Sequence, residues 1–209
     1  MIHPDAIIPS FGLKFCRGPK CPHAVATDDL APDLEKIIRD SGWPEFLIQR
    51  QSPIRHHHQF RAAVSACPNG CSQPHIADFG LIGAAHIEVD TGSCSACGLC
   101  VGACAEKALR LEPEIVLDRA LCLGCASCAR VCPTGSLAIG QKGYRVLLGG
   151  KLGRHPRLAH ELGFLSQAAA LAVLRNTLHM FMANYSPGLR LADLVTRMGQ
   201  ENFNAQVRP

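Results

Sequence analysis

The twelve cysteines of this 209-residue chain constrain its fold more than any other feature. Eight of them form two copies of one spacing, C-x2-C-x2-C-x3-C. The two copies are Cys94, Cys97, Cys100 and Cys104, and Cys122, Cys125, Cys128 and Cys132. This spacing is typical of backbone that wraps around a cubic iron–sulfur cluster. The sequence therefore predicts an electron-transfer protein.

The paired runs resemble those of two-cluster ferredoxins, in which the fourth cysteine of each run ligates the other run's cluster. Carried over to this chain, the crossing predicts two sets of ligands. They are Cys94, Cys97, Cys100 and Cys132 for one cluster, and Cys122, Cys125, Cys128 and Cys104 for the other. The alternative is a pair of zinc sites, but zinc sites usually show two C-x2-C knuckles with a longer gap between them.

The two cysteine runs belong to a longer internal repeat. A shift of 28 residues places Ile87 and Val89 onto Ile115 and Leu117. Each unit is predicted to contain a short strand, a cysteine loop, one helical turn and a returning strand. We expect residues 86–140 to form an inserted two-cluster ferredoxin domain, with residues 1–85 and 141–209 forming the domain around it.

Composition argues against several other classes of protein. The net charge is only +4, and no basic run is interleaved with aromatic residues, which disfavours nucleic-acid binding. No apolar run approaches ~18 residues, and no signal-like apolar stretch follows the start, so we expect a cytoplasmic protein without a membrane span. Disulfide scaffolds are usually short secreted chains, and the tight cysteine spacing suits metal better.

The remaining four cysteines form two separated pairs, Cys16 with Cys21 and Cys67 with Cys71. The second pair encloses Pro68-Asn69-Gly70, which is turn chemistry because Pro presets one φ angle while Asn and Gly tolerate positive φ. Such a turn suits two thiolates aimed at one concavity. Spacing alone is compatible with either zinc or a third iron–sulfur cluster here.

The stretch from Val64 to Cys71, continuing through Ile76-Ala77-Asp78-Phe79-Gly80, resembles the iron–sulfur half of siroheme sulfite and nitrite reductases. The order of parts is also similar to dissimilatory and small anaerobic sulfite reductases, which resume after their ferredoxin module with a segment like 144–156. The resemblance implies a mixed α/β, or α+β, half-domain with C-terminal helices. It also implies that Cys16, Cys21, Cys67 and Cys71 hold a third [4Fe-4S] cluster, with Cys71 bridging to siroheme iron.

The resemblance further implies a function. Electrons from a redox partner protein would enter at the two ferredoxin clusters, pass to the third cluster and reach siroheme, which would reduce sulfite or nitrite. The alternative is an electron carrier with three clusters and no siroheme. Only residues 1–15 precede Cys16, where the family usually has a half-domain that contributes basic residues, so we expect a second subunit to complete the site.

Two further departures from the family concern the site itself. The gap between Cys16 and Cys21 is four residues, where the family commonly has five. The family often presents Lys-x-Lys shortly before the CPN cysteine, whereas this chain has Gln59-Phe60-Arg61. We predict that Arg61 holds the substrate oxyanion, because guanidinium geometry suits oxyanions. The alternative is an ordinary strand arginine.

A glycine-rich basic loop, residues 149–157, contains Lys151, Arg154 and Arg157. Glycine permits close backbone approach, and basic side chains suit a polycarboxylate such as siroheme. These three residues are therefore the predicted cofactor-binding residues, in keeping with the related reductases, where the corresponding segment lies beside the macrocycle. The alternative is an exposed basic turn.

The segments outside the ferredoxin-like repeat show helical and strand patterns. A helix with Leu30, Leu34, Ile37 and Ile38 on one side is predicted to start at a cap on Thr27 or Asp28 and to end near Ser41-Gly42. Residues 59–66 and 144–148 are predicted strands. Near the C-terminus two helices are expected. Their apolar positions are Ala168, Leu171, Leu174, Leu178, Phe181 and Met182 in the first, and Leu191, Leu194, Val195 and Met198 in the second.

Overall fold

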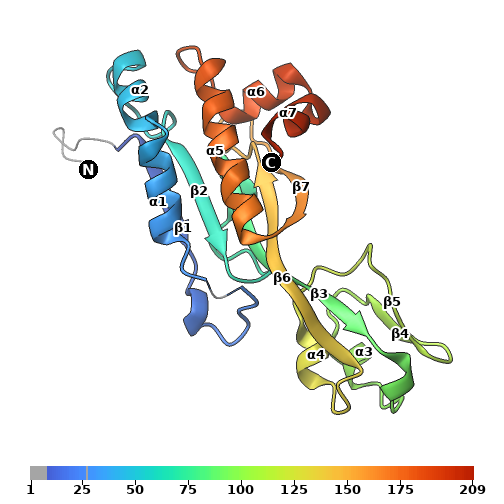
Figure 1. Ribbon diagram of the computed structural model, residues 1–209. Helices are drawn as coiled ribbons and strands as arrows, with labels where there is room; N and C mark the ends of the chain where they lie inside the picture. The colour runs from blue at the N-terminus through green and yellow to red at the C-terminus, as the bar shows by residue number, and fades with distance from the viewer. Residues whose placement is uncertain (1–8, 27) are drawn as a thin grey trace.

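The computed structural model describes residues 9–26 and 28–209, arranged as a body built on a five-stranded sheet and a smaller lobe below it (Figure 1). We call residues 86–140, which contain eight of the cysteines, the cysteine lobe. The strands are β1 (Phe11–Phe15), β2 (Phe60–Ser65), β3 (Phe79–Val89), β4 (Leu109–Leu111), β5 (Ile115–Leu117), β6 (Leu137–Leu148) and β7 (His160–Leu165). The helices are α1 (Ala31–Asp40), α2 (Trp43–Arg50), α3 (Leu99–Ala103), α4 (Ser127–Val131), α5 (Gln167–Ala183), α6 (Leu191–Met198) and α7 (Gln200–Val207). Short 3-10 turns are η1 (Gly18–Lys20), η2 (Pro74–Ile76) and η3 (Thr91–Ser93).

The sheet is mixed, with strand order β1-β2-β3-β6-β7. Strands β1, β2 and β3 are parallel, and β6 and β7 continue the sheet in antiparallel fashion. Helices α1 and α2 connect β1 to β2, which is the crossover that a parallel pair needs. This confirms the predicted mixed α/β fold and the predicted strands at 59–66 and 144–148.

The antiparallel pair β3–β6 runs from the body into the cysteine lobe. Its register extends from Phe79 opposite Leu148 in the body to Val89 opposite Leu137 in the lobe, with an irregularity between Ala85 and Ile87. Within the lobe, α3 leads to β4, β4 pairs with β5, and β5 leads to α4. The order of strand, cysteine loop, helical turn and strand therefore occurs twice, as the repeat predicted. The division into domains at residues 86 and 140 stays a prediction.

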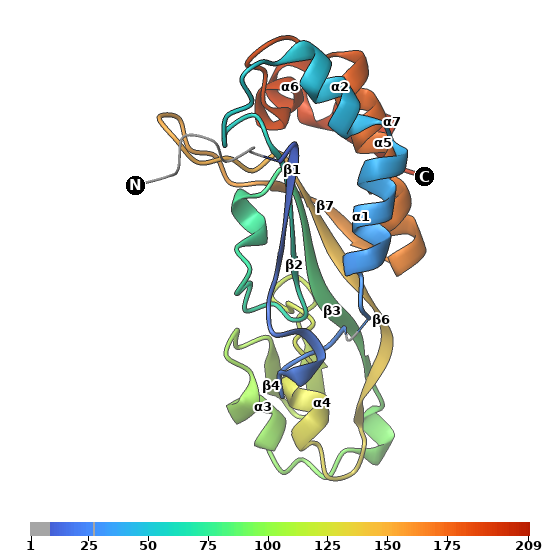
Figure 2. The ribbon, with the colours of Figure 1, turned by 90° about the vertical axis from the view of Figure 1, so that its left-hand side faces the viewer.

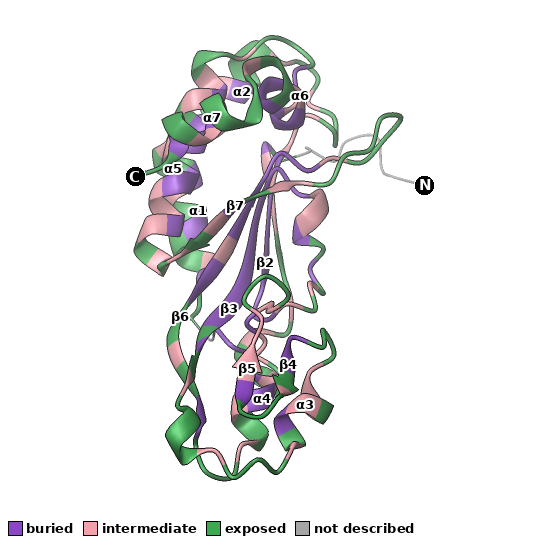
Figure 3. Cartoon of the chain, turned by 90° about the vertical axis from the view of Figure 1, so that its right-hand side faces the viewer, coloured by how far each residue is buried: buried purple, intermediate pink, exposed green. Residues whose placement is uncertain are grey.

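Successive side chains of a strand point to opposite faces of the sheet, and the two faces have different surroundings. Phe60, Ala62 and Val64 of β2 are buried in the core that the sheet forms with the helices, whereas Arg61 lies on the other face. Helices α1 and α5 cover the first face, and the η2 segment lies against the second (Figure 2). The strands are largely buried along the body (Figure 3).

The helices agree in part with the sequence patterns. Leu34 and Ile38 of α1 are fully buried as predicted, but α1 begins at Ala31, and Asp28 accepts a hydrogen bond from the Tyr144 hydroxyl (3.1 Å) instead of capping it. Thr27 lies outside the described residues. On α5 the buried side is rotated: Leu174, Leu178 and Phe181 are buried as predicted, but Ala170 and Val173 are buried in place of Ala168. Helices α2 and α7 were not predicted. Within the described part of the chain, no helix has the length and apolar character needed to cross a membrane.

Asp78 joins three parts of the body. Its carboxylate is 2% exposed and lies 3.3 Å from the guanidinium of Arg190, the residue before α6. It also accepts a hydrogen bond from the Arg61 backbone N–H (2.9 Å), and its carbonyl accepts one from Gly149 N (2.9 Å). Burial raises the pKa of Asp78, while Arg190 and the Arg61 N–H act in the opposite direction. The residue therefore ties β2, the end of β6 and the start of α6 to the start of β3.

Removing Arg190 should destabilise the body strongly. Because Arg190→Leu leaves the buried Asp78 carboxylate without its cation, we expect the free energy of unfolding to fall by roughly 3 kcal/mol. Urea unfolding followed by the fluorescence of Trp43, the single tryptophan, measures this change. Arg197→Leu, on the exposed side of α6, is the control and should have little effect. Equal midpoints for the two variants would contradict a stabilising role of the ion pair.

Candidate iron–sulfur centre

The twelve cysteines lie in three places, and each place contains four of them. We call these the distal, middle and upper sets. The distal set is Cys94, Cys97, Cys100 and Cys132; the middle set is Cys104, Cys122, Cys125 and Cys128; the upper set is Cys16, Cys21, Cys67 and Cys71. Among residues 9–26 and 28–209, no three His, Cys, Asp or Glu side chains converge closely enough to hold a single metal ion.

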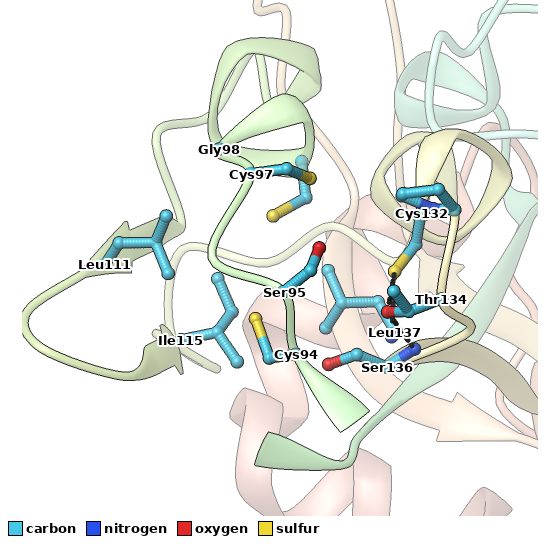
Figure 4. A pocket seen from close by; sticks show the side chains of 12 residues that line it. Cys94, Ser95, Cys97, Gly98, Leu111, Ile115, Cys132, Thr134, Ser136 and Leu137 are labelled. Carbon is cyan, nitrogen blue, oxygen red and sulfur yellow. Dashed lines mark hydrogen bonds between the residues drawn. The ribbon is translucent and has the colours of Figure 1, made fainter. Parts of the chain in front are cut away.

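The distal set lines one small cavity in the cysteine lobe (Figure 4). Cys94 and Cys97 come from the first cysteine loop, whereas Cys132 follows α4 in the second repeat. The Leu137 backbone N–H donates to Cys132 Sγ (3.5 Å) and, with the Thr134 hydroxyl, holds the pKa of that thiol below its ordinary value. A thiol on the second run thus faces the first run's loop, which is the placement that crossed ligation requires.

The middle set shows the reciprocal crossing. Cys104, which ends α3 in the first run, lies near Cys122, Cys125 and Cys128 of the second run. Burial raises the pKa of Cys128 to about 11, and the neighbouring thiolates of Cys122, Cys125 and Cys104 add to this rise. Cys104 Sγ accepts a hydrogen bond from Ala108 N (3.3 Å). Four thiols with backbone donors directed at sulfur fit a cluster that is bound by thiolates.

The upper set is assembled by the pairing of β1 with β2. Cys16 directly follows β1, and Cys67 follows β2 by two residues, so the parallel pair brings both cysteines to one edge of the sheet. Cys16 Sγ accepts hydrogen bonds from Ala66 N (3.2 Å) and Gly18 N (3.3 Å). Burial raises the pKa of Cys67, and the nearby thiolates of the other three residues raise it further.

Asn69 orients the exposed end of the upper set. Its side-chain amide donates a hydrogen bond to Cys71 Sγ (2.9 Å) across the Pro68-Asn69-Gly70 turn, in which Gly70 has φ of +64°. The predicted turn therefore has a second role, since it supplies a donor to sulfur as well as bringing Cys67 and Cys71 together. This donor fits a thiolate ligand better than a neutral thiol.

Three cysteines of the upper set and one cysteine of the middle set line a single cavity of about 560 Å³. Cys21, Cys67 and Cys71 of the upper set line it together with Cys125 and Arg130 of the cysteine lobe. The distal set lines a separate cavity. Of the two sets in the cysteine lobe, the middle set is therefore the one that shares a cavity with the upper set.

Arg61, the predicted oxyanion-binding residue, lies in a second cavity of about 460 Å³ on the open face of the sheet. Lys14 of β1 lies in the same cavity, as do Ser72 and Gln73, which directly follow Cys71. The Arg61 guanidinium donates to the His56 carbonyl (3.0 Å), and Lys14 Nζ donates to Gln73 Oε1 (2.6 Å). Both partners are neutral, so the cavity retains two positive charges.

The glycine-rich loop forms a hairpin that projects from the body between β6 and β7 (Figure 2). Lys151 and Arg157 pair through two backbone hydrogen bonds of 2.9 Å. Their charged groups contact α6: Lys151 forms an ion pair with Asp193, and Arg157 donates to the Ala192 carbonyl (2.7 Å) and the Thr196 hydroxyl. Arg154 lies exposed near the tip. The structure therefore brings Lys151 and Arg157 together against α6, whereas Arg154 lies apart from them.

Sequence reasoning missed Lys14, Arg130 and Asn69 as residues of the site. Lys14 and Arg61 lie on adjacent paired strands, in which Gly12 is opposite Arg61 and Lys14 opposite Ala63. No sequence signal marked Lys14, because the register of β1 against β2 is set by tertiary packing. Asn69 could have been found, since its place between two cysteines was already visible in the CPN motif.

The family model for the nitrite and sulphite reductase 4Fe-4S domain matches residues 20–209. The chain is 28% identical over 84% of its length to the coenzyme F420-dependent sulfite reductase of Methanocaldococcus jannaschii, of which it covers 27%. It is 32% identical over 45% of its length to one subunit of the anaerobic sulfite reductase of Salmonella typhimurium, and it covers 24% of that subunit. The chain thus spans about a quarter of these relatives.

The fold resembles solved structures of two reductases. The crystal structure of dissimilatory sulfite reductase I matches with a TM-score of 0.65 and 20% identity, covering 93% of this chain and 51% of that one. Mycobacterium tuberculosis NirA matches with a TM-score of 0.50 and 18% identity, covering 91% of this chain and 26% of that one. These likenesses show the shared fold.

Asn69 should tune a cluster bound by the upper set. A hydrogen bond to sulfur stabilises the more negative, reduced state, so Asn69→Leu should lower the reduction potential of that cluster by about 40 mV. A redox titration followed by electron paramagnetic resonance measures the shift, with Asn202→Leu on α7 as the control. A potential that rises, or that stays the same while the cluster remains assembled, would show that the Asn69 amide does not act on Cys71.

Proposed function

Because the chain belongs to the nitrite and sulphite reductase 4Fe-4S domain family, we propose that it is an iron–sulfur oxidoreductase chain with three [4Fe-4S] clusters that serves the reduction of sulfite or nitrite. The observation that carries this proposal is the gathering of all twelve cysteines into three sets of four. In this reading the cysteine lobe is an inserted two-cluster ferredoxin module with bounds at 86 and 140.

The spatial order of the three sets supports a relay of electrons. Cys94 and Cys132 of the distal set lie beyond the lobe end of the β3–β6 pair at Val89 and Leu137, whereas Cys125 of the middle set shares a cavity with the upper set. An electron-donor protein that docks at the end of the lobe would therefore face the distal set. Cys97, which is exposed there, and the neighbouring Leu99, 56% exposed, suit the centre of such a contact.

Siroheme is the second part of the proposal. When bound, siroheme supplies the iron at which a sulfur or nitrogen oxyanion is reduced. The cavity of Lys14 and Arg61 fits an anionic cofactor or substrate, because it keeps two positive charges and its volume lies within the usual range for small-molecule sites. Its lining includes Ser72 and Gln73, which directly follow Cys71 in the sequence, while Cys71 itself lines the cavity of Cys21 and Cys67.

The chain's own residues have distinct roles in this site. Arg61 presents a planar guanidinium that holds a carboxylate or an oxyanion by two hydrogen bonds, and Lys14 adds a point charge. Asp78 fixes the backbone of Arg61 on β2. We propose that Arg154, near the tip of the hairpin, reaches a macrocycle carboxylate, and that a second subunit supplies the remaining basic contacts.

The alternative is an electron-transfer chain with three clusters and no siroheme. One observation favours it: two of the three predicted cofactor-binding cations, Lys151 and Arg157, are directed at α6. Their contacts stabilise the hairpin within this chain and leave fewer charges for a polycarboxylate. The two functions differ in the pigment that the native protein contains.

Metal analysis tests the three clusters. Protein purified without oxygen should contain about twelve irons per chain, four for each set. Cys97→Ser should damage the distal cluster and leave the signal of the upper cluster intact, because the two sets share no ligand. Zinc in place of iron, or only eight irons, would remove the upper set from the proposal.

The visible spectrum tests siroheme. Protein isolated from its native host with its partners should show the Soret and red bands of an iron isobacteriochlorin, and acid–acetone should extract the pigment. Arg61→Ala and Arg154→Ala should each reduce the retained pigment, whereas Arg175→Ala on the exposed side of α5 should not. A preparation with only broad iron–sulfur absorbance would favour the electron-transfer chain.

A further inference from the structure

Arg130 connects the cysteine lobe to the body by hydrogen bonds from one side chain. It lies on α4 between Cys128 and Cys132. Its Nη1 donates to the Cys125 carbonyl (3.0 Å), and its Nη2 donates to the carbonyls of Ala24 (3.0 Å) and His23 (3.4 Å). Arg130 and Ala24 lie 106 residues apart in the sequence.

The acceptors belong to the loops that carry two different cysteine sets. Cys125 is itself a member of the middle set, and His23 and Ala24 follow Cys21 of the upper set in the same short loop. Arg130 also lines the cavity that the two sets share. A guanidinium is a rigid fork with several donors, so it holds two loops at a defined separation.

We propose that Arg130 is a positioning residue that sets the separation and relative orientation of the middle and upper cysteine sets. This inference rests on the proposed function, because it requires that the middle set and the upper set each hold a cluster. One electron leaves one set and enters the other across this gap, and no bond forms or breaks. The spacing of the two sets then depends on a contact outside either ligand set.

A second contact keeps the lobe in place when Arg130 is removed. Ala85 N on β3 donates to the Gly124 carbonyl (2.9 Å), and a Cβ at Gly124 would meet the Ala85 carbonyl oxygen at 2.6 Å. Because β3 and β6 also join the lobe to the body, Arg130→Ala should fold. Its effect should be confined to the loop 21–26 and the gap between the two sets.

The experiment compares Arg130→Ala with the unaltered chain by iron content, hydrogen exchange and electron paramagnetic resonance. Iron content should stay the same. The Ala24 amide, which donates to Cys21 O, should exchange roughly tenfold faster, because the loss of a hydrogen bond to a charged group shifts a local opening equilibrium by about that factor. In dithionite-reduced protein, the magnetic interaction between the two clusters should become weaker and broader.

Three further variants separate position from charge. Arg119→Ala removes an equal charge near Cys122 in a different cavity and should leave both readouts unchanged. Arg130→Lys keeps the charge but loses the fork, so it should restore only part of the interaction. Gly124→Ala leaves the charge unchanged but displaces the loop that carries Cys125, because the new Cβ would meet the Ala85 carbonyl oxygen. This variant should therefore also alter the magnetic interaction between the two clusters.

The outcomes are distinguishable from failure of the proposed function. Full restoration by Arg130→Lys, or unchanged exchange and magnetic interaction in Arg130→Ala with iron intact, would overturn the positioning role. An unaltered chain with fewer than about twelve irons would count against the three-cluster function. Exchange at Ala24 would still decide whether Arg130 holds the loop, because that measurement requires no iron.

Discussion

The antiparallel pairing of β3 with β6 is the constraint on which the rest of the structure depends. One end of the pair forms the centre of the body sheet, and the other end forms the base of the cysteine lobe. Phe79 and Leu148 face the body core, while Ile87 and Leu137 belong to a second hydrophobic cluster around the lobe cysteines. A slip of one residue would turn the apolar side chains of one strand to the wrong face, so each core specifies the register at its own end of the pair. The irregularity between Ala85 and Ile87 separates the two registers.

This arrangement explains which features the sequence could predict. The cysteine lobe depends on local spacing, and its repeated strand, loop and helical turn were visible from the cysteines and from Ile87 and Ile115 alone. The crossing of Cys104 and Cys132 followed from the same pattern. The upper set was harder, because Cys16 and Cys67 meet only through the parallel pairing of β1 with β2. Spacing left both zinc and iron–sulfur open there, and the resemblance to a family was needed to favour one.

The basic residues show where sequence reasoning reaches its limit. Lys151 and Arg157 were chosen because they are cations in a glycine-rich loop, a criterion that cannot detect a partner far along the chain. Asp193, which pairs with Lys151, is 42 residues away, and α6 brings it close. Gly150 is explained by packing, since a Cβ there would meet the Ala77 carbonyl oxygen at 2.6 Å. The loop pattern thus reflects a hairpin docked on α6 and η2 as much as a ligand site.

The partners of the cations divide them into two classes. Lys151, Arg145 and Arg190 each face a carboxylate, from Asp193, Glu161 and Asp78, so their charges are compensated within the chain. Lys14 and Arg61 instead donate to neutral oxygens of Gln73 and His56, and both lie in one cavity beside the turn that carries Cys71. A hydrogen bond to a neutral carbonyl orients a cation without cancelling its charge. The open face of the sheet therefore presents two cations whose side-chain hydrogen-bond partners carry no charge. Asp78 holds the backbone of Arg61 there and does not line the cavity.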